Sequence, residues 1–413
     1  MAGSWRARRR LGTVASVAVV ATAASLVLVG CGSSLVGGSS SDPNTEASSS
    51  GPAVITVTPE KSGAAIRADS PIVVSVDNGK LSVVTVTGPG GQLRGSMNPQ
   101  SSAWTSDAKS LDFASTYDVR AAAVDGTGHS VELARALKTV TPSRVVGARY
   151  ENSASGDTVG TGTMVRLVFD EPVKNRQQVE KALLVTSSAP IVGAWSWNAD
   201  QTAVAFRPQT YWPGSDSVTV SANLKGVELS KGAYGDRAYR TSFRTGPAYV
   251  ITVDSAKHRM DVSVNGKPVK KFPITTGKPG FDTPSGIMPI MAKEGTVVMD
   301  SAGIGYGKNS SEYYHVTAYS AMRLTSRGVY IHAAPWSEGS QGYDNVSHGC
   351  IGMSISNAAW LYDRVHPGDV VVVKNAGEDI DSGNGITDWN VSWPKWLAAS
   401  ALGAQTFGPT ATG

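Results

Sequence analysis

The sequence predicts a mainly β protein: two β-sandwich domains, a third β-rich domain with one short helix, and a C-terminal extension that contains tryptophan. The chain has 413 residues, too many for one hydrophobic core at about 100–200 residues per domain. Short runs of Val, Thr and Ser recur between turns in a chain with 45 Gly and 21 Pro, a pattern that favours strands over helices. The net charge of +4 comes with no basic stripe or helix, which argues against a nucleic-acid partner.

The first 30 residues have the pattern of an export signal. Four Arg within residues 6–10 precede an uncharged apolar run at residues 11–29. Gly30-Cys31 then resembles the site at which a lipoprotein receives a diacylglyceryl group on its cysteine. We therefore expect residues 1–30 to be a signal peptide, and Cys31 to carry a lipid that anchors the folded part in the cell membrane, on its extracytoplasmic side. An uncleaved membrane anchor with a chance Cys is the alternative.

Residues 31–52 are rich in Ser and Gly and nearly free of apolar residues, so we expect a flexible tether. Residues 53–143 change to short alternating runs, separated by turns such as Asp77-Asn78-Gly79. These runs lie at 54–57, 72–76, 81–87, 117–121 and 131–137. Short strands at such spacing predict an immunoglobulin-like (Ig-like) β-sandwich.

Residues 144–247 show the same pattern and predict a second Ig-like sandwich. Its apolar runs lie at 165–169, 194–197, 203–206 and 217–220. The Cys and Trp spacing of antibody domains is absent, so the assignment concerns architecture only. We expect both sandwiches to be spacers, with wall binding or substrate positioning as the alternative, because neither contains a cluster of candidate catalytic residues.

A third domain is expected at residues 248–375. Runs at 249–254 and 260–264 lead into Asn265-Gly266, which suits the type I′ turn of a hairpin. Residues 357–364 predict a short helix, and residues 370–373 a closing strand. Residues 376–413 form the extension, and we expect its Trp389, Trp393 and Trp396 to pack on the third domain because they avoid water. An exposed aromatic face for glycans is the alternative.

Two cysteines occur in the chain, Cys31 and Cys350. If Cys31 carries a lipid, no internal disulfide can form, and Cys350 is a free thiol in an oxidising compartment. A thiol becomes a nucleophile through a lowered pKa or a nearby base. Cys350 follows His348 and Gly349, and Gly349 leaves room for a substrate to approach the sulfur.

His332 is the candidate base. It ends the predicted strand 329–332, and Pro335-Trp336 turns the chain soon after. The following loop, residues 337–346, has no regular period, so we expect His332 and Cys350 to converge from a strand end and a loop end. A His at a turn or a buried Cys is often only structural. The combination of one unlipidated Cys, an exported chain and flanking His and Gly favours catalysis.

These motifs resemble those of the L,D-transpeptidases. The resemblance rests on His332 and its loop, on Ser347-His348-Gly349-Cys350, on Thr275-Thr276-Gly277-Lys278-Pro279, on Thr283-Pro284-Ser285-Gly286, and on Ala334-Pro335-Trp336. With the lipoprotein start, two Ig-like domains and the Trp-bearing extension, the whole chain is similar to multi-domain enzymes of actinobacterial cell envelopes, including mycobacterial ones.

The resemblance implies an enzyme that forms 3→3 cross-links in peptidoglycan. Cys350 would attack the third residue of a donor tetrapeptide stem, His332 would act as base and then acid, and D-alanine would leave. The amine of an acceptor stem would then open the thioester. The implied partners are these two stems and carbapenem-type β-lactams as covalent inhibitors; no cofactor is implied, and we expect a monomer.

The resemblance also assigns the surrounding residues. The backbone carbonyl of Ala333 would orient the imidazole of His332. Oxyanion stabilisation and substrate binding are assigned to His348, Gly349, Tyr314, Ser347, Trp336 and Gly352. Tyr314 lies eighteen residues before His332, where the family places a Tyr hydroxyl, although Tyr313 is adjacent.

Two positions depart from the family pattern. Ala333 replaces a frequent Ser, with the same backbone carbonyl, and Gly352 stands where many relatives carry Asn or Arg, which affects how the donor stem is held.

Other activities use the same Cys–His site: an L,D-carboxypeptidase, or attachment of wall proteins to the stem. A non-catalytic wall-binding module is the alternative of another class. The absence of His-Glu-x-x-His and of paired cysteines argues against a metal site.

Overall fold

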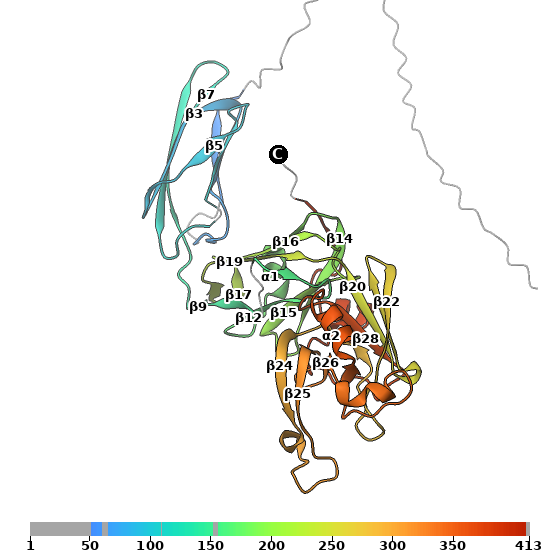
Figure 1. Ribbon diagram of the computed structural model, residues 1–413. Coiled ribbons are helices and arrows are strands. Elements are labelled where there is room, and N and C mark those ends of the chain that lie inside the picture. The colour runs from blue at the N-terminus through green and yellow to red at the C-terminus, as the bar shows by residue number, and fades with distance from the viewer. Residues whose placement is uncertain (1–50, 60–64, 109, 152–155, 410–413) are drawn as a thin grey trace, which may run out of the picture. The chain divides into compact units, whose positions relative to one another are not determined.

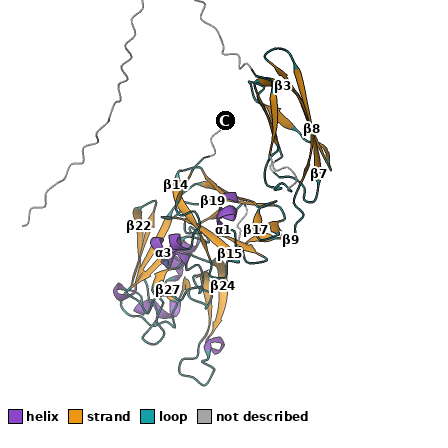
Figure 2. Ribbon diagram, turned by 180° about the vertical axis from the view of Figure 1, so that it is seen from behind, coloured by secondary structure: helices purple, strands orange, loops and turns teal. Residues whose placement is uncertain are grey.

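The computed structural model describes residues 51–59, 65–108, 110–151 and 156–409. The predicted signal peptide, Cys31 and nearly all of the tether lie outside these residues. Figure 1 shows that the described chain is built mainly from strands, and Figure 2 shows that its helices are short. In this described part, no helix combines the length and apolar character needed to cross a membrane.

The first sandwich consists of two four-stranded antiparallel sheets. One contains, in spatial order, β1 (Val54–Thr58), β2 (Val73–Asp77), β6 (Ala103–Ser106) and β5 (Gly95–Met97). The other contains β4 (Gly91–Gln92), β3 (Gly79–Gly88), β7 (Thr116–Asp125) and β8 (Ser130–Lys138). The inward-facing apolar residues of both sheets form one core. Asn78 has a φ of 57°, which suits the predicted turn between β2 and β3.

The second sandwich has a larger and a smaller main sheet. The larger contains β10 (Ala148–Glu151), β12 (Val165–Phe169), β15 (Ala203–Pro208), β14 (Ile191–Trp197) and β29 (Gln405–Phe407). The smaller contains β11 (Thr158–Val159), β19 (Ala238–Thr245), β16 (Ser217–Asn223) and β13 (Leu183–Ser187). A third, small sheet contains β17 (Glu228–Ser230), β18 (Ala233–Gly235) and β9 (Arg144–Val146). The helix α1 (Arg176–Ala182) precedes β13.

The prediction that the tryptophans of the extension pack on the third domain is wrong. They lie against the second sandwich, where the Trp396 Nε1 atom donates to the carbonyl of Ala194 at 3.0 Å. The Trp389 Nε1 atom donates to the carbonyl of Gly162 at 2.7 Å. The guanidinium of Arg207, in β15, lies over the rings of these two residues and of Trp393.

The physical reason is that the second sandwich offers an apolar outer face and an open sheet edge. Trp396 is buried on Ala194 and Ala205, on the outer side of β14 and β15. The short helix α3 (Trp393–Ala398) holds it there, and β29 then pairs antiparallel with β14. The carboxylate of Glu180, in α1, accepts the backbone N–H groups of residues 401 and 402. Burial on this face and pairing of the β14 edge together favour the second sandwich.

The third domain has two sheets around one core. The first contains β22 (Lys267–Pro273), β21 (Arg259–Val264), β20 (Tyr249–Asp254), β28 (Val370–Lys374) and β23 (Gly286–Ile287). The second contains β24 (Ala292–Asp300), β25 (His315–Arg323), β26 (Tyr330–Ala333) and β27 (Ile351–Met353). The helix α2 (Ile355–Tyr362) packs on β25 and β26. The predicted fold class, two β-sandwiches followed by a β-rich domain with a short helix, is confirmed.

Local chemistry explains the predicted turn and helix. Asn265 and Gly266 have φ values of 50° and 76°, as a type I′ turn requires. The hydroxyl of Ser354 accepts the backbone N–H of Asn357 and caps the N-terminus of α2, which begins two residues before the predicted start.

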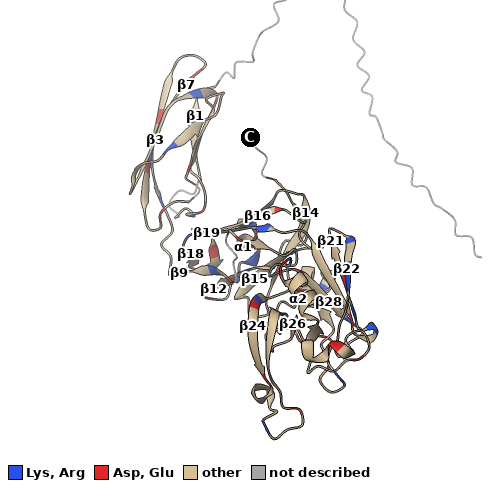
Figure 3. Ribbon diagram, in the orientation of Figure 1, with Lys and Arg blue, Asp and Glu red and all other residues tan. Residues whose placement is uncertain are grey.

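The hairpin of β24 and β25 is absent from the sequence prediction. Figure 1 shows it as a long pair of strands with a loop at its far end. The register shifts on both sides of Gly295, so the apolar alternation of β24 is broken. The connecting segment includes a short 3₁₀ turn, Ser301–Ile304. Figure 3 shows that charged residues of both signs are interspersed along the described strands.

Candidate active site

Two neighbouring strands bring His332 and Cys350 to one face of a sheet. β26 and β27 are parallel, and His332 lies opposite Gly352 in the register. Cys350 precedes Gly352 by two residues, and residues two apart along an extended chain point to the same face. The predicted base and the predicted nucleophile therefore face the same side.

Both residues line a cavity of about 230 Å³. It is lined by Thr275, Met299, Tyr314, Val316, His332, Ala334, Trp336, Ser337, Val346, Ser347, His348, Cys350 and Gly352. Seven of the predicted site residues are among them. Gly349 is buried beside Cys350, and Ala333 is buried next to His332. Cys31 lies outside the described residues.

The His332 ring has a defined tautomer. Its Nδ1 atom lies 2.8 Å from the carbonyl oxygen of Ala333, and a carbonyl only accepts, so Nδ1 carries the proton. The Nε2 atom is then an acceptor. Burial lowers the pKa of His332, which is 4% exposed, and this favours the neutral imidazole. A neutral ring with an unprotonated Nε2 has the state that a general base requires.

The Cys350 thiol is neutral at rest. Burial raises its pKa to about 11. The Sγ atom lies 3.7 Å from the carbonyl oxygen of Gly328, to which the thiol donates. A neutral thiol needs a base to form the nucleophilic thiolate.

The loop that carries Cys350 is held by the residues around it. The Ser347 hydroxyl donates to the Cys350 carbonyl at 2.6 Å and accepts the Gly349 N–H at 3.1 Å. Gly349 has a φ of 112°, which a residue with a side chain adopts only with strain. The Gly349 N–H, assigned to the oxyanion by resemblance, is therefore engaged with Ser347 here.

The Thr-Pro-Ser-Gly and Thr-Thr-Gly-Lys motifs form the support beneath this loop. The Thr283 hydroxyl donates to the carbonyl of Gly349 at 2.8 Å and accepts the N–H of Gly277 at 2.9 Å. Thr275 and Gly352 exchange backbone hydrogen bonds of 3.0 and 2.9 Å. These bonds fix the backbone on either side of Cys350.

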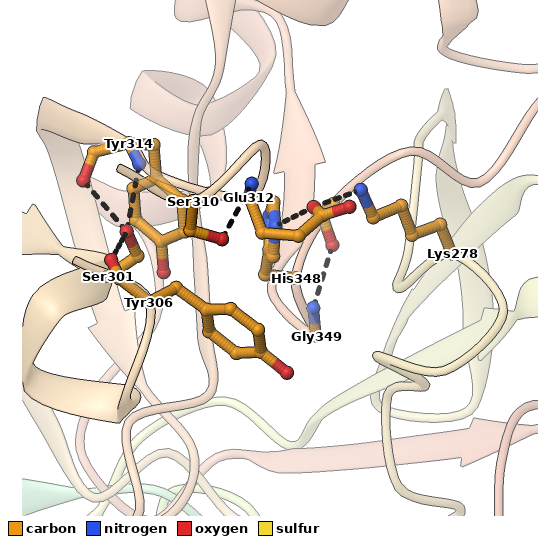
Figure 4. A network of polar contacts seen from close by, with 9 residues as sticks. Lys278, Ser301, Tyr306, Ser310, Glu312, Tyr314, His348 and Gly349 are labelled. Atoms are coloured by element: carbon orange, nitrogen blue, oxygen red, sulfur yellow. Dashed lines mark hydrogen bonds and ion pairs between the residues drawn. The ribbon is translucent and has the colours of Figure 1, made fainter. Parts of the chain in front are cut away.

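His348 sits in a polar network on the same side (Figure 4). Its Nε2 atom is 2.7 Å from the carboxylate of Glu312, which also binds Lys278 at 2.5 Å. The rings of Tyr314 and Phe281 flank it, with centroids 4.8 and 4.5 Å away. The Nε2 atom of His348 is therefore engaged with Glu312 and is not the atom that takes the Cys350 proton, and the supporting role of His348 stays a prediction.

Two further predicted residues shape the cavity. Trp336 is 54% exposed, and its ring lies 5.9 Å from that of His332, between centroids. A Cβ atom at Gly352 would lie 2.9 Å from Thr275 and 3.0 Å from Ala334, so this glycine widens the floor of the cavity. Burial, followed by the nearby Cys350, raises the pKa of Tyr314 and keeps its hydroxyl protonated.

Sequence reasoning missed several residues of the site. Met299 and Val316 line the cavity from the β24–β25 hairpin, and Glu312 approaches it from the connecting segment. The sequence offers little indication of these residues, because the bulges around Gly295 interrupt the alternation of apolar and polar residues by which a strand is recognised. Among the described residues, no group of three or more His, Cys, Asp or Glu is arranged to hold a metal ion.

Two families match the chain. Residues 63–228 match the bacterial Ig domain, and residues 248–373 match the L,D-transpeptidase catalytic domain. The chain is 33% identical to L,D-transpeptidase 2 of Mycobacterium tuberculosis (strain CDC 1551 / Oshkosh), over 81% of this chain and 82% of that protein. It is 31% identical to L,D-transpeptidase 5 of strain H37Rv, over 87% of this chain and 79% of that protein.

A solved structure is also similar. It is L,D-transpeptidase 3 from Mycobacterium tuberculosis in complex with a faropenem-derived adduct, 31% identical. The similarity covers 56% of this chain and 98% of that chain, with a TM-score of 0.45.

Proposed function

Because this chain belongs to the L,D-transpeptidase family, we propose that it cross-links peptidoglycan stems 3→3 through a thioester on Cys350. The observation that carries the proposal is the pairing of a neutral thiol and a neutral imidazole on one cavity. A neutral thiol is a weak nucleophile without a base. With the imidazole as base, the thiolate forms only when the thiol attacks the amide, so the resting site need not hold a charged sulfur.

The first half-reaction forms the thioester. His332 Nε2 takes the thiol proton of Cys350 as sulfur bonds to the carbonyl carbon of the third stem residue. The carbon–nitrogen bond to D-alanine then breaks, and His332 passes the proton to the leaving amine. The developing oxyanion is stabilised by N–H groups of the loop around Cys350 and by the Tyr314 hydroxyl, where one such donor contributes about 2.7–4 kcal/mol.

The second half-reaction consumes the thioester. The side-chain amine of an acceptor stem attacks the carbonyl, the carbon–sulfur bond breaks, and the amine proton returns through His332 to the sulfur. If water attacks instead, the same acyl-enzyme acts as an L,D-carboxypeptidase. If the amine belongs to another wall protein, that protein is attached to the stem.

We further propose that carbapenems acylate Cys350. A strained β-lactam carbonyl presents the same electrophilic centre as the donor amide, and the ring opens without a departing fragment. Cys350→Ala is expected to abolish the covalent adduct.

We also propose that the enzyme is a monomer that works at the outer side of the cell membrane, held there by a lipid on Cys31; the N-terminal sequence supports the location and the anchor. Labelled palmitate is expected to enter the protein and to be lost in Cys31→Ser. Labelling that persists in Cys31→Ser would contradict this anchor.

Intact-protein mass spectrometry with a disaccharide tetrapeptide tests the main proposal. Loss of D-alanine with a thioester on Cys350, followed by a cross-linked dimer, is the expected result. A thioester that yields only free tripeptide assigns the carboxypeptidase. A folded protein that forms no adduct overturns the proposal in favour of a non-catalytic wall-binding module.

A further inference from the structure

Glu312 is an acidic residue that contacts His348 in the lining of the cavity, and the proposed chemistry leaves it without a role. It lies in the segment between β24 and β25, two residues before Tyr314. Its Oε2 atom lies 2.7 Å from His348 Nε2 and 2.5 Å from Lys278 Nζ (Figure 4). These three residues come from three separate segments of the third domain.

The contacts of Glu312 join the two walls of the cavity. Met299, Tyr314 and Val316 form one wall, which belongs to the β24–β25 hairpin. Ser347, His348 and Cys350 belong to the opposing loop. Glu312 lies on the hairpin side, and its carboxylate forms a hydrogen bond with His348 on the loop side. This bond links the two walls of the cavity.

Ionisation of Glu312 defines the state of His348. Hydrogen bonds, first from Lys278 and then from His348, lower the pKa of Glu312 and keep it a carboxylate. A carboxylate only accepts, so the Nε2 atom of His348 carries a proton. The donor and acceptor roles in this bond are therefore fixed, and His348 Nε2 holds the hairpin through Glu312.

The imidazole of His348 in turn fixes Tyr314. The Tyr314 ring lies against one side of it, 4.8 Å between centroids, and Phe281 lies edge-on at 4.5 Å. The backbone N–H of Tyr314 donates to the hydroxyl of Ser301 at 2.8 Å, which ties the same residue to the start of the segment. If Glu312 releases His348, Tyr314 loses one of the surfaces that set its place in the cavity.

We propose that Glu312 is a positioning residue: by linking Lys278 and His348 it latches the hairpin to the Cys350 loop and sets the position of Tyr314 for acyl transfer. The inference rests on the proposed function, because it assigns Tyr314 a part in that reaction. Glu312 acts through His348 and Tyr314 and need not touch the substrate.

A double-mutant cycle on formation of the Cys350 thioester tests this role. The variants are Glu312→Ala, Tyr314→Phe and both together, with kcat and KM measured for release of D-alanine from the donor stem. Glu312→Ala is expected to lower kcat about tenfold and to change KM less than about threefold. In the Tyr314→Phe background, the same substitution is expected to lower kcat less than about twofold, because coupled residues are not additive.

Two further variants sharpen the test. Glu312→Gln retains an oxygen that accepts the His348 Nε2 proton, and we expect it to recover at least about half of the lost kcat. Asp261→Asn is the matched control: Asp261 pairs with Arg259 in the first sheet of the third domain, 2.9 Å away, and neither residue lines the cavity. Its kcat is expected to stay within about twofold of the parent protein.

Each outcome bears on the proposal. The proposal is overturned if Glu312→Ala lowers kcat tenfold both in the parent protein and in Tyr314→Phe. It is also overturned if Glu312→Ala unfolds at the same temperature as the parent protein and keeps the parent kcat. A Glu312→Gln protein as slow as Glu312→Ala overturns it as well, because the bond to His348 would then not be the link. If the parent protein itself forms no thioester, the proposed function fails first, and the latch fails with it.

Discussion

The imidazole of His332 is oriented by the backbone of the next residue, Ala333, through a 2.8 Å bond from Nδ1 to the carbonyl oxygen. The side chain at position 333 takes no part in this bond. The departure from the family pattern, Ala in place of Ser, therefore leaves the orientation of the base unchanged. The Nε2 atom remains unprotonated, as the proposed role of His332 as the base requires.

Loss of this base should slow acylation while leaving the fold intact. We expect His332→Ala to reduce the rate of carbapenem acylation about 10²- to 10⁴-fold, the usual contribution of general base catalysis. Mass spectrometry at timed intervals gives the rate. His129→Ala, an exposed His of the first sandwich, is the control and should react at the parent rate. A His332→Ala protein that reacts as fast as the control would remove His332 from the mechanism.

The pH dependence of Cys350 reactivity follows from the two pKa shifts. The pKa of His332 is lower than the usual histidine value of about 6.5, so the imidazole is neutral at pH 7 and above. We therefore expect the rate of carbapenem acylation to be constant between about pH 7 and 9 and to fall only in more acidic buffer. In His332→Ala, alkylation by iodoacetamide depends on the free thiolate and should rise about tenfold per pH unit toward the thiol pKa of about 11. A parent acylation profile with its midpoint above pH 7 would contradict the lowered pKa of His332.

Asp369 should make the protein less stable as pH rises. It is completely buried, and burial raises its pKa from 3.8 to about 7. Between these values the folded state binds a proton that the unfolded chain has lost, so the free energy of unfolding falls with increasing pH. Asp369→Asn removes this penalty and should stabilise the protein at pH 8, with little change at pH 4.

Thermal unfolding across this range measures the effect of Asp369. The gain at pH 8 should be at most a few kcal/mol, since each pKa unit is worth about 1.4 kcal/mol. The exposed Asp200→Asn serves as control and should show no pH-dependent gain. Destabilisation of Asp369→Asn at every pH would show that lost hydrogen bonding, and not a buried charge, dominates this site.

The extension should contribute strongly to stability through Trp396. This side chain is 3% exposed, so Trp396→Ala removes a buried ring and is expected to lower the free energy of unfolding by about 3–5 kcal/mol. Trp393, which is only partly buried, is the comparison, and its alanine variant should lose clearly less. Denaturant unfolding measures both, and equal losses would show that the depth of burial does not set the contribution.

The sequence predicts the candidate nucleophile and base of the site better than it predicts the residues of the β24–β25 hairpin that line the cavity. His332 ends a strand, and Cys350 follows two residues that mark a tight loop, so their convergence can be predicted from nearby residues. Glu312 acquires its side-chain contacts through residues 34 and 36 positions away. Because bulges around Gly295 break the alternation of β24, the hairpin that carries Glu312 leaves no periodic pattern to follow.

The resemblance to L,D-transpeptidases is confirmed by relatives that match most of the chain. The position of the three tryptophans is the main error, because proximity along the chain favours the third domain, whose core the start of the extension does join through Ile380. The partner of β29 is β14, about two hundred residues earlier, and such a pairing depends on an open strand edge that the sequence does not reveal.

The pairing of β29 with β14 makes the third domain an insertion within the second sandwich, since one sheet of that sandwich is completed by residues from both sides of it. A protease that cut the peptide between residues 247 and 248 would leave two fragments joined by a shared sheet. For the same reason, recombination that exchanges the catalytic segment alone would separate β29 from its neighbour. We expect the second sandwich and the enzyme to have been inherited together.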